Sequence, residues 1–542
     1  MRENTDSSPM PAKLRRRYRR WIGLIAASAI AILVASIFLG FWPLSLFIQD
    51  PWDAIPKSSP EEIAKLHQPD ALRADLDEII ALHERTCPNP YLRVSKDSIL
   101  ALAERLKASI DRPMTRREFL PIVMEMQAGY RSDHYGQGVR WEDFAAAFAA
   151  GERLLPFRAA PEGDGLVVVA VAESERAIEP GDKIVRIGTV PAAEHLARLR
   201  SLQPGESERW RDVCVREYFR ANSWVVGIKL PTEVELIRPD GSRQVVTVEG
   251  VGDDARKTER TAAGDAPPTT PAVPQGKTLV DSPPFRCMLL PSEPSDAAPM
   301  ALIDFPTMDS TLGGQWDTFL DRAIAAANAR GAAGLIVDIR KNGGGSTDLG
   351  YALLARLTDR PYRMSSRLVW RRSEESDELF RMKAKPMWRW LTIVLPIFMP
   401  EYTKLKHGED LTSEFEATSR PRVEPGFDGP SCLLIGDKTF SAATALADGV
   451  RTYDLMLTIG QPTGGVPNTL GDIGPFQLPN SGIVVNFSQK MFIRASGDET
   501  DVGPVRPHIE VTPIPGRDAA LERAIQEIRE MDKERKGLPS PR

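Results

Sequence analysis

The feature that most constrains this chain is a long apolar stretch close to its N-terminus. Residues 21–42 contain no charged side chain, and they follow a basic cluster made of Lys13, Arg15, Arg16, Arg17, Arg19 and Arg20. As a helix, this stretch would be about 33 Å long, enough to cross a hydrocarbon core of roughly 30 Å. A cleaved signal peptide has a shorter apolar region and a small-x-small site, whereas bulky Phe38, Phe41 and Trp42 close this one. We therefore predict an uncleaved anchor, with the basic tail of residues 1–20 in the cytoplasm and residues after 50 on the other side of the membrane.

The composition of the chain indicates several globular domains. Its 542 residues are too many for one hydrophobic core, and 42% hydrophobic with 26% charged residues is ordinary for such domains. A net charge of -5 gives no basic surface for nucleic acid. The cysteines are scattered without metal-ligand spacing, at Cys87, Cys214, Cys287 and Cys432. We expect no nucleic-acid partner, no metal and no cofactor.

Different patterns follow one another along the chain. Leu72, Leu76 and Ile79 recur at helical spacing, and Thr115 with Glu118 is typical of a capping box at the start of a helix. Short apolar runs separated by turns then indicate strands. We predict a multidomain α/β protein with these parts: a helical domain at 58–150, a β-rich domain at 156–250, a flexible linker at 251–285, an αβ core at 286–371 and 427–516 with an insertion at 372–426, and a C-terminal helix and tail at 517–542.

Two predicted strand-to-helix junctions carry residues suited to chemistry. The first runs through Asn342, Gly343, Gly344 and Gly345 before Ser346, and its glycines leave backbone N–H groups free to hold an anion near a helix N-terminus. A phosphate is disfavoured there, because a phosphate-binding loop ends in Gly-Lys-Ser/Thr. The second junction places Ser441 just before a helix, where an ordinary N-cap serine is the commoner role.

Several motifs together resemble one enzyme family. Asp-Ile-Arg-Lys-Asn-Gly-Gly-Gly at 338–345, Thr-Phe-Ser-Ala-Ala at 439–443 and Gly-Gln-Pro-Thr-Gly-Gly at 460–465, in this order, resemble the C-terminal processing and tricorn-type serine peptidases, also called tail-specific proteases. The resemblance covers residues 75–515 and implies a helical N-terminal part, a PDZ-like domain and a crotonase/ClpP-like αβ catalytic core. It also implies that Ser441 is the nucleophile, and that the N–H of Gly343 or Gly344 forms the oxyanion hole with that of Ala442.

The resemblance also suggests how the serine is activated. One branch of the family uses a lysine about 25 residues after the serine, and Val466 stands in its place; the tricorn-like branch takes a histidine from the N-terminal domain, which points to His134. The family's acid comes from just before a Gly-x-x-Pro-Asp segment, and here both Asp501 and Glu499 are candidates. The chain departs from the pattern at Asp133, where tricorn carries a serine, and at His508, where the family has an aspartate.

The middle of the chain carries a second resemblance. Residues 179–187 resemble the core of PDZ domains, which bind peptide C-termini by strand addition, although residues 195–228 form an insertion that this pattern does not explain.

We therefore expect a membrane-anchored serine endopeptidase that hydrolyses periplasmic or extracellular polypeptides through an acyl-enzyme. The alternative is a catalytically inactive peptide-binding scaffold of the same fold. The substrate, the oligomeric state and the role of the insertion at 372–426 are left open.

Overall fold

The computed structural model describes residues 49–136, 140–252, 259–261, 276–291, 298–389, 399–514 and 516–537. The predicted anchor at 21–42 lies outside these ranges. None of the helices within them has the length and apolarity that a bilayer crossing requires.

The N-terminal unit is helical, as its apolar spacing predicts. After a short 3₁₀ turn η2 (Pro51–Ala54), it comprises α2 (Pro60–Ala64), α3 (Pro69–Thr86), α4 (Lys96–Ala108), α5 (Arg116–Gly129), η3 (Asp133–Tyr135) and α6 (Trp141–Ala149), with the strand pair β1 (Leu66–His67) and β2 (Met114–Thr115). Leu72, Leu76 and Ile79 are buried on one face of α3, and the predicted capping box of Thr115 and Glu118 opens α5.

The middle unit is a twisted sheet with helices packed on it. Its strands follow the order β3-β4-β5-β7-β8, and its elements are β3 (Phe157–Glu162), β4 (Gly165–Ala172), β5 (Lys183–Ile187), β6 (Val190–Pro191), α7 (Ala192–Ser201), α8 (Glu208–Glu217), α9 (Phe219–Val225), β7 (Thr232–Ile237) and β8 (Arg243–Val248). The residues that fit no PDZ pattern form most of α7 together with α8 and α9.

The predicted linker at 251–285 is wrong in part, because two strands lie within it. β9 (Glu259–Thr261) pairs with β4 of the middle sheet, and β10 (Lys277–Ser282) pairs with β11 (Phe285–Leu290) at the edge of the core sheet. An edge strand gains its hydrogen bonds from the neighbouring backbone, so it needs little apolar periodicity of its own. Val280 of β10 is nevertheless buried in the core.

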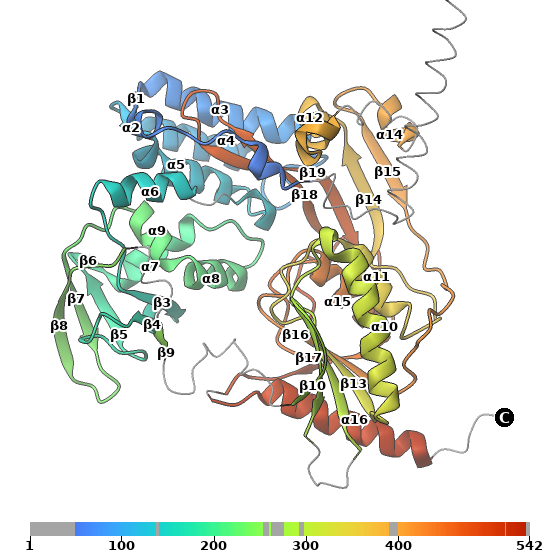
Figure 1. Ribbon diagram of the computed structural model, residues 1–542. Helices are drawn as coiled ribbons and strands as arrows, with labels where there is room; N and C mark the ends of the chain where they lie inside the picture. The colour runs from blue at the N-terminus through green and yellow to red at the C-terminus, as the bar shows by residue number, and fades with distance from the viewer. Residues whose placement is uncertain are drawn as a thin grey trace, which may run out of the picture.

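The αβ core is a seven-stranded sheet covered on both faces. Its strand order is β10-β11-β12-β13-β16-β17-β20, and its parallel part is β12 (Met300–Asp304), β13 (Gly334–Asp338), β16 (Ser431–Ile435), β17 (Leu457–Gly460) and β20 (Ile509–Glu510). One face packs against α10 (Gly313–Ala329), α11 (Thr347–Leu354) and α15 (Ala442–Thr452), and the other against α16 (Ala519–Gly537), as Figure 1 shows. Burial on both faces explains why these strands read as continuous apolar runs.

A second sheet joins the core to the helical unit. It has the order β15-β14-β19-β18, formed by β14 (Ser365–Arg371), β15 (Asp410–Glu414), β18 (Thr469–Gln477) and β19 (Val484–Arg494). The β18–β19 hairpin extends to α3 (Figure 1), where the buried Asp75 carboxylate accepts hydrogen bonds from Asn480 and Ser481 at its tip. Leu478, Ile483 and other hairpin side chains share one hydrophobic cluster with the N-terminal helices. The hairpin therefore fixes the helical unit against the αβ core.

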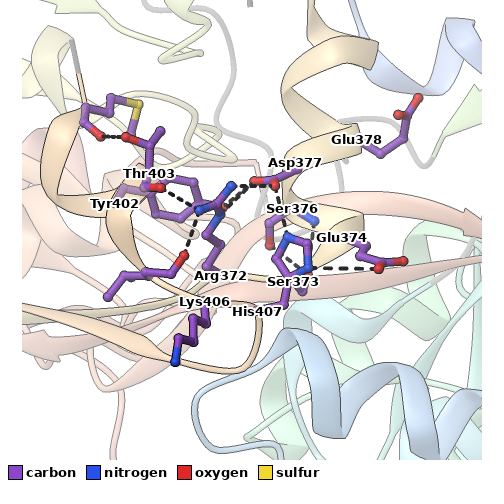
Figure 2. A network of polar contacts seen from close by, with 12 residues as sticks. Arg372, Ser373, Glu374, Ser376, Asp377, Glu378, Tyr402, Thr403, Lys406 and His407 are labelled. Atoms are coloured by element: carbon purple, nitrogen blue, oxygen red, sulfur yellow. Dashed lines mark hydrogen bonds and ion pairs between the residues drawn. The ribbon is translucent and has the colours of Figure 1, made fainter. Parts of the chain in front are cut away.

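The insertion at 372–426 folds onto this second sheet. It holds α12 (Glu374–Lys383) and α14 (Pro400–Lys404), and it ends in β15 and the stretch leading to β16. Figure 2 shows how Asp377 of α12 lies between Arg372 and His407, with donor–acceptor distances of 2.9 and 3.1 Å. Arg372 also donates to the carbonyl oxygens of Thr403 and Leu405, both at 2.7 Å. This network ties together α12, the end of α14 and the turn before β15.

Candidate active site

Ser441 lies on a strained turn between β16 and α15. Its backbone has φ 51° and ψ -124°, a region that L-residues other than glycine rarely adopt, and its side chain makes no capping hydrogen bond. The role of an ordinary N-cap serine is therefore excluded for this residue. A serine held on a strained strand-to-helix turn is the arrangement that exposes a nucleophile above a sheet.

The structure brings His134 to this serine. Its Nε2 lies 3.2 Å from Ser441 Oγ, although the two residues are 307 positions apart in the sequence. The imidazole is 8% exposed and stacks on Phe440 at a centroid distance of 5.0 Å. Phe440 stacks in turn on Trp210 of α8, at 4.3 Å. The helical unit supplies η3, which carries the histidine and packs against the β18–β19 hairpin, and the middle unit supplies Trp210. The helical unit, the middle unit and the core therefore all help to hold His134 beside Ser441.

Asp133 is the carboxylate that orients the histidine. Its Oδ1 lies 2.7 Å from His134 Nδ1, and its side chain is 1% exposed. With Nδ1–H donating to Asp133, Nε2 carries the lone pair that can accept the serine proton. In the sequence, Asp133 stands out only as a departure from the tricorn pattern. Its signal was its place beside His134 in a short turn, which lets neighbouring side chains meet.

The two acids expected from the family pattern lie elsewhere. Asp501 is half exposed and forms an ion pair with Arg494, and Glu499 is half exposed and pairs with Arg367 at 2.5 Å. Neither is hydrogen-bonded to His134, whose Nδ1 is occupied by Asp133. The expectation that one of them orients the histidine is therefore wrong for this structure, because arginines of the second sheet hold both carboxylates.

Further polar groups lie behind Asp133, and the sequence analysis missed them. The Thr469 hydroxyl is 3.3 Å from Asp133 Oδ1 and 2.9 Å from Glu206 Oε1. Arg93 Nη2 lies 3.1 Å from Glu206 Oε2. Burial, followed by the nearby charge of Asp133, raises the pKa of Glu206 well above its usual value, although Arg93 acts in the opposite direction. Glu206 belongs to the loop before α8, and no spacing in the sequence connects it with the histidine.

The glycine loop packs directly against the serine turn. A Cβ added to Gly344 would lie 2.7 Å from Ser441 Cβ, so only glycine fits there, and its φ of 95° also favours glycine. The N–H of Gly344 donates to Asn342 Oδ1 at 2.9 Å. Among the described residues, the N–H groups of Gly343 and Ala442 have no such intramolecular acceptor. The geometry therefore favours Gly343 over Gly344 as the partner of Ala442 in an oxyanion hole.

The described part of the chain holds no group of three or more histidine, cysteine, aspartate or glutamate side chains able to bind a metal ion. All four cysteines are buried and free, and burial raises their thiol pKa values. The groups that meet at the site are Ser441, His134, Asp133 and the backbone N–H groups of the glycine loop.

Part of the chain matches a known protein family. The model of peptidase family S41 matches residues 299–511, which run from the start of β12 to just beyond β20 and include Ser441 and the glycine loop. No curated protein matches the sequence.

Two solved structures of mature CPAF share the fold. The crystal structure of mature CPAF has a TM-score of 0.57 and 17% identity, over 87% of this chain and 99% of that chain. The structure of mature CPAF complexed with lactacystin has a TM-score of 0.56 and 17% identity, over 86% of this chain and 98% of that chain. The photosystem II D1 C-terminal processing protease gives a TM-score of 0.38 and 16% identity, over 83% and 98%. The chain thus contains, at residues 299–511, a domain that matches the model of peptidase family S41 and includes Ser441, and its fold is similar to that of mature CPAF.

Proposed function

We propose that this chain is an endopeptidase that hydrolyses polypeptides through Ser441, His134 and Asp133. The observation that supports this most is the 3.2 Å approach of His134 Nε2 to Ser441 Oγ, at a strained turn and beside a glycine loop. A nucleophile within hydrogen-bonding reach of a base, which is in turn oriented by a third group, is the arrangement that activates a serine, and Ser441, His134 and Asp133 provide it.

The reaction follows from the positions of these groups. His134 Nε2 takes the proton of Ser441 as Oγ attacks the peptide carbonyl carbon, and the Asp133 carboxylate stabilises the imidazolium that forms. The N–H groups of Gly343 and Ala442 donate to the oxyanion. His134 then gives its proton to the leaving amine nitrogen, which leaves an acyl-Ser441. A water molecule, deprotonated by His134, attacks the acyl carbon and releases the acid and the free serine.

A membrane-anchored arrangement with the catalytic part in the periplasm or outside the cell belongs to the same proposal. The basic cluster and the apolar stretch at 21–42 support it, together with the way the chain enters the described region. Gln49 is held on α12 by two hydrogen bonds, from its backbone N–H to Lys383 O at 2.8 Å and from its side chain to Met382 O at 2.9 Å. Gln49 lies seven positions after Trp42, and seven residues of chain reach at most about 25 Å. The insertion face that carries α12 would therefore lie close to the bilayer.

We also propose that the middle unit is PDZ-like and recruits substrate C-termini. The position of β3 at the edge of its sheet supports this, because an edge strand can accept an added peptide strand. A peptide with a free C-terminal carboxylate should then compete with a polypeptide substrate better than its C-terminal amide does.

The proposed catalytic role is tested by labelling with a fluorophosphonate, which reacts with activated serines. The full chain in detergent would be compared with Ser441→Ala, His134→Ala and the control His407→Ala, whose histidine is exposed in the insertion. We expect labelling and casein hydrolysis by the wild type and by His407→Ala, and neither by the other two variants. A folded wild type that neither labels nor hydrolyses would instead support the peptide-binding scaffold.

The location is tested separately with a reporter enzyme that is active only outside the cytoplasm. Fused after residue 542, it should be active, and deleting residues 1–48 before the fusion should abolish that activity. Retained activity without residues 1–48 would contradict the anchor.

A further inference from the structure

Glu206 reaches the catalytic histidine through a chain of three contacts. Its side chain is 1% exposed and lies 2.9 Å from the Thr469 hydroxyl, which lies 3.3 Å from Asp133 Oδ1, and Asp133 holds His134 at 2.7 Å. Each member comes from a different part of the fold. Glu206 precedes α8 in the middle unit, Thr469 begins β18, and the Asp133–His134 pair forms η3 of the helical unit.

In this series of contacts, each hydrogen bond has a donor and an acceptor only if one of the two carboxyl groups, Glu206 or Asp133, carries a proton. The Thr469 hydroxyl has a single hydrogen, and its neighbours include the Leu470 carbonyl oxygen at 3.1 Å, which can only accept, as can two ionised carboxylates. If both were ionised, Thr469 could donate to one of them and would face the other oxygen to oxygen. Asp133 already accepts from His134 Nδ1, and its negative charge is needed to stabilise the imidazolium. The proton therefore belongs on Glu206, which then donates to Thr469 while Thr469 donates to Asp133.

The charges around Glu206 are consistent with this assignment. The charged groups that act on Glu206 are Asp133 of η3, which favours the protonated form, and Arg93 of the loop before α4, which favours the ionised form. Arg93 favours an ionised Glu206, but its guanidinium also donates to the backbone carbonyl of Asn468. Full burial and the charge of Asp133 outweigh this attraction and raise the pKa of Glu206.

We propose that Glu206 is a positioning residue of this peptidase, which stays protonated and donates through the Thr469 hydroxyl to Asp133, and thereby fixes the carboxylate that orients His134. The inference rests on the proposed function and deepens it. It gives the middle unit a part in catalysis, because the loop of Glu206 leads directly into α8. That helix stacks Trp210 on Phe440 and pairs Arg216 with Asp437 at 3.1 Å, both beside the turn of Ser441.

A dependence on pH follows from the proposal. When Glu206 loses its proton as the pH rises, the Thr469 hydroxyl turns to Glu206 and Asp133 loses one of its hydrogen bonds. We expect kcat to fall on the alkaline side as this happens.

The test uses the full chain in detergent and a peptide substrate, with kcat and KM measured across pH. Glu206→Ala and Thr469→Val should lower kcat by about 10- to 100-fold with little change in KM, the loss expected for one hydrogen bond to a charged group. Thr469→Ser should restore kcat. Glu206→Gln, which keeps an N–H donor but cannot ionise, should keep most of kcat at neutral pH and lose the alkaline decline due to Glu206. The exposed Glu208 offers a matched control, and Glu208→Ala should leave the pH profile unchanged.

Two results would overturn the proposal. One is a Glu206→Gln variant that is as impaired at neutral pH as Thr469→Val, since an ionised Glu206 would then be required. The other is a Thr469→Val variant with the wild-type pH profile and kcat. An infrared difference spectrum of wild type against Glu206→Gln gives a reading that needs no activity. We expect a C=O band of a buried protonated carboxyl at neutral pH, and its absence would overturn the proposal even if the wild type hydrolyses nothing.

Discussion

The role of Asp133 can be tested with one isosteric change, Asp133→Asn. The carboxylate lies 2.7 Å from His134 Nδ1 and is almost fully buried. Opposite charges about 4 Å apart at an effective dielectric constant of about 20 attract by about 4 kcal/mol. At 1.36 kcal/mol for each factor of ten, losing this attraction to the imidazolium slows the reaction about a thousandfold. An asparagine that donates to Nδ1 would also fix the wrong tautomer, which takes the loss toward about 10⁴-fold.

The assay is the rate of fluorophosphonate labelling together with kcat for a peptide substrate. The matched controls are Asp501→Asn and Glu499→Gln, the acids expected from the sequence, which are half exposed and paired with arginines. Each should change the rate by less than about threefold, since neither touches His134 and exposed pairs contribute little. A loss below tenfold in a folded Asp133→Asn variant, or an equal loss in either control, would refute the reasoning.

Two further predictions concern the glycine loop and the insertion. Gly344→Ala should abolish labelling, because its new Cβ would lie 2.7 Å from Ser441 Cβ. Gly343→Ala should keep most activity, because a Cβ at that position would have no neighbouring atom within 4 Å. The same labelling assay checks both variants. Burial raises the pKa of Asp472, but Lys490 and Lys383 lower it overall to about 2. Because the pKa of Asp472 is lower in the folded protein than in the unfolded chain, its ionisation stabilises the fold at pH values above the unfolded pKa of 3.8. This stability is lost as the pH falls toward about 2. In urea unfolding, Asp472→Asn should therefore cost about 2 kcal/mol at pH 7, with the difference shrinking from pH 4 downward; a constant difference would contradict this.

Much of the local structure could be predicted from the sequence, because neighbours along the chain decide it. The helical spacing of Leu72, Leu76 and Ile79 gave a buried helix face, and Thr115 with Glu118 gave a capping box. The order of the glycine loop, Ser441 and a histidine in an N-terminal turn identified the peptidase motifs. The strands β9 and β10 were missed, since their pairing depends on backbone partners far along the chain.

What the sequence by itself determined is thus the local structure of most elements, the choice of Ser441 and His134 as candidates, and the basic and apolar pattern that predicts an anchor. Only the tertiary structure decided which acid reaches the histidine, which glycine N–H remains free, and that Thr469 and Glu206 lie behind Asp133. The physical reason is that a sequence motif describes only residues that are close to one another along the chain. The partner of a buried charge is instead fixed by how the helical unit, the β18–β19 hairpin and the loop before α8 pack together. The helical unit and the hairpin share one hydrophobic cluster, and the helices that flank this loop, α7 and α8, pack into another.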